Sequence, residues 1–348
     1  MLTLSAPDAI SPAIHRTRQL LFHPFRLGTF LKLCLVAVFT EGFSGNFNFG
    51  GHGGGAHNAP APSPAPSLEI LFSPVFLFII FVAIVFGVAI SLLVLYLITR
   101  LRFALFECLT RQSTLIAPGW SRYREPARRF FWLNVVVGLV FLLVIVLIAI
   151  PFAAGFYHFY QSSAANHSFD LGRFLSLILP LIPIIILLVL AAIATDIILR
   201  DFMLPHYALE NATAGHAWAA VRARIAAEKG PFFVYALLRI FLPALAIVAI
   251  FLVLVIPSIV VIAVTALSFA GLHAAFTHGG LLGIAFAVLA GIVVVLAVIA
   301  YLILAALCFG GPLSLAVRNY ALVFYGGRYQ PLGDILFPPP ASQPAPGA

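Results

Sequence analysis

Long runs of apolar residues, separated by short polar stretches, dominate the chain. A helix that crosses the roughly 30 Å apolar part of a bilayer needs about 20 apolar residues. Six runs approach this length and predict transmembrane helices at residues 27–43, 74–98, 131–152, 174–199, 234–263 and 281–308. None alternates apolar and polar residues as a barrel strand does, and only helices or closed barrels satisfy the backbone in lipid. The pattern therefore predicts an all-α polytopic membrane protein with six transmembrane helices.

Composition supports this class. Hydrophobic residues make up 63% of the chain and charged residues 9%, whereas about 25% of a soluble domain is charged. The run at residues 27–43 is the shortest, and Lys32 interrupts it. We expect one membrane domain over residues 1–330, with a flexible Gly-, Pro- and Ala-rich external loop at 42–68. A Pro-rich tail at residues 331–348 is predicted to be disordered.

Basic residues lie almost entirely in alternate gaps between the runs. Cytoplasmic loops of membrane proteins carry an excess of Lys and Arg, so this asymmetry indicates orientation. With six spans, all but one of the 19 basic residues fall on the side of the N-terminus, and the exception is Arg173. We therefore expect both termini in the cytoplasm of a bacterium and the helices in its cytoplasmic (inner) membrane. The net charge of +8 then reflects topology, and we expect no nucleic-acid partner.

The segments that flank the runs are similar three times over. Before the first, third and fifth runs a basic stretch meets a proline, at Pro24, Pro126 and Pro231. After the other three runs an arginine precedes an aromatic residue, in LRFAL (101–105), LRDFML (199–204) and VRNYAL (317–322). These similarities predict three hairpin units, residues 11–112, 113–212 and 213–330, each beginning with a cytoplasmic interfacial helix. Shared preferences at membrane boundaries are the alternative explanation.

The second and third of these basic stretches mix aromatic and basic residues as helices in the headgroup plane do. Tryptophan favours the interface, and arginine favours anionic lipid. The predicted interfacial anchors are Trp120, Arg122, Arg124, Trp218, Arg222 and Arg224. They serve either plain anchoring or lipid sensing and partner docking. In both cases anionic headgroups at the cytoplasmic face are the expected partner.

Several short motifs also carry a family resemblance. These are PF in the first basic stretch, the tryptophan of the middle loop, DFMLP with a tryptophan thirteen residues after its proline, and PLSLAVRNYALVFYG. Over roughly residues 11–332 the chain resembles an uncharacterised family of bacterial multi-pass membrane proteins. That family is similar to the membrane domain found beside glycerophosphodiester phosphodiesterases. The resemblance implies a six-helix membrane fold and supplies no activity.

Charged residues near the cytoplasmic ends of the runs form one candidate site. Asp196 precedes Arg200 by four residues, which favours an ion pair on one helix face. An ionisable group within a span is costly and faces the protein interior or water. We expect a polar cluster at the cytoplasmic mouth that comprises Asp196, Arg200, Asp201, Arg239, Glu107 and Arg318. It either handles a substrate or proton, or it ends the fourth span as an interfacial ion pair.

Signals for metal, cofactor or enzyme chemistry are weak. His273 and His278 lie in a short predicted external loop, and imidazole binds zinc, copper or nickel. Their five-residue spacing does not share a helix face, and no Cys pair or HExxH supports a metal site. The sequence contains no P-loop, dinucleotide-binding or nucleophile-elbow motif. We expect no metal, no cofactor and no enzymatic activity.

Two functions fit these features. One is a non-catalytic membrane component that organises or binds lipid or other membrane proteins. The other is a transporter or channel for a small or lipid-like solute. Scarce charge in the middle of the spans favours the first function, because ion-coupled transport usually uses a buried carboxylate.

The predicted topology has a direct test. A topology reporter fused after Gly51 is expected outside the cytoplasm, and the same reporter fused after Arg122 is expected inside. The measurement is reporter activity in intact cells, and activity on the same side from both fusions would contradict the topology.

Overall fold

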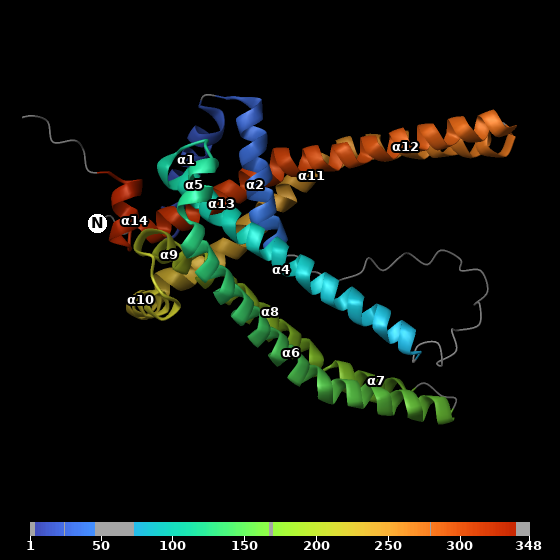
Figure 1. Ribbon diagram of the computed structural model, residues 1–348, viewed down its shortest axis with the longest axis horizontal. Coiled ribbons are helices and arrows are strands. Elements are labelled where there is room, and N and C mark those ends of the chain that lie inside the picture. Colours follow the sequence, from blue (N-terminus) through green and yellow to red (C-terminus); the bar gives the residue numbers. More distant parts are fainter. Residues whose placement is uncertain (1–3, 24, 46–72, 167–169, 279, 339–348) are drawn as a thin grey trace, which may run out of the picture. The chain divides into compact units, whose positions relative to one another are not determined.

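A computed structural model describes residues 4–23, 25–45, 73–166, 170–278 and 280–338. Helices are the only regular secondary structure within these ranges, which confirms the all-α prediction (Figure 1). The chain divides into two compact units. The first contains Met1–Ile10, Ser121–Leu238 and Tyr320–Ala348, and the second contains Ser11–Trp120 and Arg239–Asn319. The predicted external loop lies largely outside the described residues.

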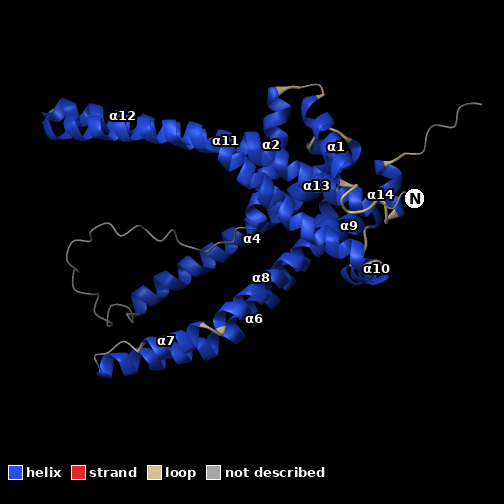
Figure 2. Ribbon diagram, turned by 180° about the vertical axis from the view of Figure 1, so that it is seen from behind, coloured by secondary structure: helices blue, strands red, loops and turns tan. Residues whose placement is uncertain are grey.

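The first unit holds a long antiparallel hairpin and several short helices. Its elements are α6 (Arg124–Asn166), α7 (Leu171–Ile178), α8 (Leu181–Ile197), the π-helix η1 (Ile198–Met203), α9 (Leu204–Glu210), α10 (Ala214–Ala227) and α14 (Gln330–Leu336). Helix α6 lies side by side with α7 and α8 in both views (Figures 1 and 2). Pro180, which has no N–H to donate, lies at the break between α7 and α8.

The second unit holds α1 (Ile10–Phe22), α2 (Leu27–Gly45), α4 (Pro74–Arg111), α12 (Gly280–Ala305) and the π-helix η2 (Ala306–Gly310). Besides α1, whose first residue Ile10 belongs to the first unit, three helices continue from one unit into the other: α5 (Ala117–Arg122), α11 (Lys229–His278) and α13 (Gly311–Gly326). Helix α4 begins with Ser73 as its N-cap, because the Ser73 hydroxyl accepts a hydrogen bond from Phe76 N–H at 3.2 Å. The Ser258 and Tyr301 hydroxyls, 3.0 Å apart, join α11 to α12.

Five helical stretches, not six, are long and apolar enough to cross a membrane within the described residues. They are Pro74–Arg111, Arg124–Ser163, Leu171–Glu210, Lys229–Ala274 and Leu282–Gly326. The predicted first span at residues 27–43 is helical but is not one of these long apolar stretches. It carries Lys32 and Glu41, its described part ends at Gly45, and one face including Leu33, Cys34 and Ala37 is buried in protein. The prediction of six such helices was therefore wrong at α2.

Buried side chains gather at the ends of the apolar helices rather than along their lengths. In the most apolar window of each of the five stretches, no residue is buried. By contrast, residues 98–110, 197–207 and 317–327 are almost entirely buried. These segments include the arginines that follow the second, fourth and sixth apolar runs. Arg102, Arg200 and Arg318 have exposed fractions of 5%, 4% and 6%. The arginines are core residues, and the apolar lengths have surface that lipid can cover.

Two further predictions differ from the structure. The tail was predicted to be disordered from residue 331, but residues 330–336 form α14 because Leu332 and Leu336, one turn apart, are both buried. Residues 339–348 lie outside the described part of the chain. The loop predicted around His273 and His278 is instead the last turns of α11.

A close helix contact in the second unit gives a stability prediction. A Cβ atom at Gly311 would overlap Cys34, whereas one at Gly310 would meet Val38 Cγ2 at an ordinary 3.7 Å. We expect Gly311→Ala to destabilise the protein by about 1–3 kcal/mol through overpacking. Gly310→Ala is the matched control, and it should be neutral or stabilising because alanine favours helix by up to about 1 kcal/mol. Thermal unfolding in detergent measures both, and equal midpoints would contradict the close approach.

Candidate functional site

The structure pairs the two charged residues that were predicted to share a helix face. Arg200 Nε lies 2.5 Å from Asp196 Oδ1, with the Arg200 side chain 4% exposed and the Asp196 side chain 43% exposed. The arginine thus lies in the core of the first unit while the aspartate lies near its surface. This ion pair sits where α8 passes into η1.

Asp201, the next residue along η1, is buried and separately engaged. Its Oδ2 accepts a hydrogen bond from the Tyr235 hydroxyl of α11 at 2.8 Å. Every residue from 199 to 207 is buried, so this segment is surrounded by protein rather than presenting one apolar stripe. A π-helical turn inside a longer helix is often found at functional sites. Here it carries an arginine and an aspartate into the core.

The other predicted arginines meet a carboxylate that the sequence analysis did not single out. In the second unit, Arg318 Nε lies 2.8 Å from Glu41 Oε1, and Arg239 Nη2 lies 3.5 Å from Glu41 Oε2. The three side chains come from α13, α11 and α2 and are only 8–14% exposed. The sequence did contain a signal for Glu41. The chain has only eleven carboxylates, and this one lies near the end of an apolar run, where an ionisable group usually faces the protein interior.

Further arginines in the second unit bind backbone carbonyls. Arg102 Nη2 lies 3.5 Å from Thr40 O, next to Glu41 in the chain. Arg100 donates to Trp120 O, and its guanidinium lies 4.5 Å from the Trp120 ring centroid. Glu107 pairs with Arg111 one turn later at 2.7 Å. Glu107 therefore has a local partner within α4.

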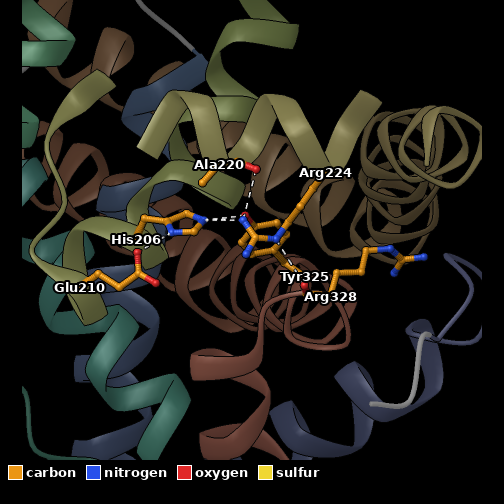
Figure 3. Close-up of polar contacts among 6 residues, drawn as sticks. All are labelled: His206, Glu210, Ala220, Arg224, Tyr325 and Arg328. Carbon is orange, nitrogen blue, oxygen red and sulfur yellow. Dashed lines mark hydrogen bonds and ion pairs between the residues drawn. The ribbon is translucent and has the colours of Figure 1, made fainter. Parts of the chain in front are cut away.

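A histidine at the centre of the first unit organises a second polar cluster (Figure 3). His206 on α9 is 1% exposed; its Nε2 lies 2.8 Å from the Tyr325 hydroxyl, and its Nδ1 lies 3.2 Å from Glu210 Oε2. An imidazole that donates from Nδ1 to the carboxylate accepts at Nε2 from the phenol. The Tyr329 ring packs on the imidazole with centroids 4.2 Å apart. Sequence reasoning missed His206 and Tyr325 as site residues, although they lie beside DFMLP and within PLSLAVRNYALVFYG, since their contact joins residues 119 positions apart.

Arg224 reaches this cluster from α10. Its Nη1 lies 3.4 Å from His206 Nε2 and donates to Ala220 O at 3.2 Å, while its Nε donates to Arg328 O at 3.3 Å. The guanidinium also lies 5.1 Å from the Tyr329 ring centroid, within the range of a cation–π contact. Arg224, predicted as a membrane anchor, thus holds α10 against α9 and the end of α13.

Arg328 connects three separate segments of the first unit. It donates to Glu228 Oε2 at 2.7 Å, to Leu4 O at 3.0 Å and to Phe324 O at 3.1 Å. Burial, with the nearby Glu210 hydrogen bond and charge, raises the pKa of the neighbouring Tyr329 phenol. Tyr329 therefore remains a protonated phenol. These contacts tie the start of the chain to the end of the last span.

The remaining predicted anchors divide between surface and interior. Trp218 is 47% exposed, and Arg222, one turn later on α10, is exposed on the same face, while Ala217 and Val221 are buried. Arg122 and Arg124 are also exposed. Trp120 is half-buried. Trp218, Arg222, Arg122 and Arg124 therefore lie at the surface of the protein.

A metal centre finds no support within the part of the chain that the structure describes. No group of three or more His, Cys, Asp or Glu residues there is arranged to hold an ion. His273 is an exposed residue of α11, and the side chain of His278 lies outside the described residues. Positions five residues apart on a helix occupy different faces.

The chain belongs to a family of unknown function (DUF7544), whose model matches residues 4–335. No curated protein and no solved structure matches it significantly. Membership covers almost all of both units, so the two polar clusters lie within the family's characteristic region.

The Glu41 ion pairs predict a large effect of neutralisation. Glu41→Gln leaves Arg239 and Arg318 beside an uncharged amide, and breaking a buried ion pair costs about 3–5 kcal/mol. Glu125→Gln is the matched control, because Glu125 pairs with Arg129 at 2.6 Å on the surface and such pairs contribute about 0–1 kcal/mol. Unfolding free energies in detergent test the difference, and similar losses for both variants would contradict it.

Proposed function

We propose that the protein is a non-catalytic integral membrane protein of the bacterial inner membrane that binds anionic lipid at its cytoplasmic face. The observation that carries this proposal is the exposed face of α10, where Trp218 and Arg222 lie one turn apart while the neighbouring Ala217 and Val221 are buried. Tryptophan and arginine together suit the headgroup layer. The apolar lengths of the five stretches offer further surface to lipid or other membrane proteins.

Contacts within each unit support placing both termini in the cytoplasm. Leu4 contacts Arg328 beyond the last span, and Arg16 Nη2 donates to Leu109 O, 3.1 Å away at the end of α4. The start of the chain and the end of α4 are then on one side of the bilayer. Since α4 itself crosses, the chain must cross once more between α1 and Pro74. We propose that α2 takes part in this crossing, with its Glu41 facing Arg239 and Arg318.

The order of the helices also supports the proposed three-fold repeat. A helix of 6–14 residues, α1, α5 or α10, precedes each helix that leads outward, α2, α6 or α11. A returning helix then ends in a buried segment with Arg102, Arg200 or Arg318. We propose that the resemblance to the membrane domain beside glycerophosphodiester phosphodiesterases reflects this architecture and no shared activity.

Transport of a small solute is a second candidate, and Glu41 is the observation that favours it. A buried carboxylate on a helix that meets two other helices is the kind of group that ion-coupled transport uses. Solute flux into reconstituted vesicles distinguishes this candidate from lipid binding, since a lipid-binding protein gives none.

Fluorescence of Trp218 tests the proposed function. In a Trp120→Phe, Trp132→Phe background reconstituted in vesicles, we expect brominated phosphatidylglycerol to quench Trp218 more than brominated phosphatidylcholine does. Adding Arg222→Gln should reduce the preference, because each basic residue near the surface contributes about 1 kcal/mol toward anionic lipid. Lack of quenching by either lipid would place Trp218 in water and contradict the proposal.

A further inference from the structure

The turn between α1 and α2 in the second unit presents an exposed aromatic cluster. The Phe22 and Phe25 side chains are 46% and 56% exposed, and both pack on Phe30, with ring centroids 6.0 and 5.8 Å away. Leu27 beside them is 62% exposed. Large apolar side chains at the tip of a turn suit the boundary between headgroups and acyl chains.

Basic residues flank this cluster in the sequence. Arg18, Arg26 and Lys32 are exposed, and none forms an ion pair with a carboxylate of the described residues. The sequence contains no Asp or Glu between Asp8 and Glu41. The surface is thus complementary to an anionic phosphate layer, and its apolar tip is complementary to acyl chains.

A pocket is lined in part by His23, the residue that follows Phe22 of the aromatic cluster in the chain. Its volume is about 490 Å³, and it is lined by Gln19, Leu20 and His23 of α1 and by Gln112, Ser113, Thr114 and Leu115 after α4. Amide and hydroxyl groups of this kind hydrogen-bond to polyols and phosphate oxygens. Leu115, which also lines the pocket, is an apolar side chain that is 67% exposed.

We propose that this pocket binds one anionic phospholipid with a hydroxylated headgroup, such as phosphatidylglycerol. The headgroup hydroxyls occupy the pocket beside Gln19 and Thr114, the phosphate lies near Arg18 and Arg26, and an acyl chain lies along Phe22 and Leu115. A free sugar or soluble phosphate ester would leave the apolar side chains uncovered. The inference rests on the proposed function and assigns it a site separate from α10.

Native mass spectrometry of the full chain in detergent tests the site with phosphatidylglycerol and phosphatidylcholine of equal chain length. We expect the wild type to retain one phosphatidylglycerol in preference to phosphatidylcholine. Arg18→Gln with Arg26→Gln should weaken retention roughly ten-fold or more, as two surface charges are lost. Gln19→Leu with Thr114→Val should weaken it at unchanged charge. Arg128→Gln with Lys229→Gln is the charge-matched control, because both side chains are exposed and lie outside the pocket and the Trp218–Arg222 face, and it should retain the lipid.

The outcomes separate the two proposals. If the wild type prefers phosphatidylglycerol but both pocket variants retain it like the wild type, the pocket is not the site, while anionic lipid binding stands. If only the arginine variant loses lipid, binding is a surface charge effect and the pocket assignment is overturned. If the wild type shows no preference, the proposed function fails with it. Unfolding midpoints equal to that of the wild type show that each variant is folded.

Discussion

A charged side chain on an apolar helix must either reach water or be paired inside the protein. This constraint explains where the polar residues of the chain lie. Glu41 lies between Arg239 and Arg318 in the second unit, and Arg200 pairs with Asp196 in the first. The cost of removing such charges from water is large, so they are tolerated only with close partners. Helices that carry them are thereby fixed to one another at these points.

The same constraint gives each long helix two different parts. One part is apolar and exposed, with surface suited to lipid. The other is buried and rich in hydrogen bonds, as in the His206, Tyr325 and Arg224 cluster of the first unit. Buried polar groups that are fully paired make a packing arrangement specific, because few alternatives satisfy all of them. Trp218 and Arg222 of α10, by contrast, lie on the surface.

Much of the fold followed from the sequence, because apolar run length and helix formation in lipid are tightly linked. Five of the six predicted spans are long apolar stretches, and the break at Pro180 follows from the missing N–H. The exception was α2, which carries two charges: Glu41 pairs with Arg239 and Arg318, and Lys32 is exposed. The candidate site was harder to predict, since Glu41 and Arg318 are far apart in the chain and no local spacing reports their contact. His206 likewise gains its partners only through tertiary packing.

The claim that these charges belong to a paired protein core is tested most directly by a double-mutant cycle. The unfolding free energy of the wild type is compared with those of Glu41→Gln, Arg318→Gln and the double variant. A buried contact at 2.8 Å predicts that the two substitutions are coupled by about 1–3 kcal/mol. Additivity within about 0.5 kcal/mol would show that the two charges act independently and would contradict the paired core.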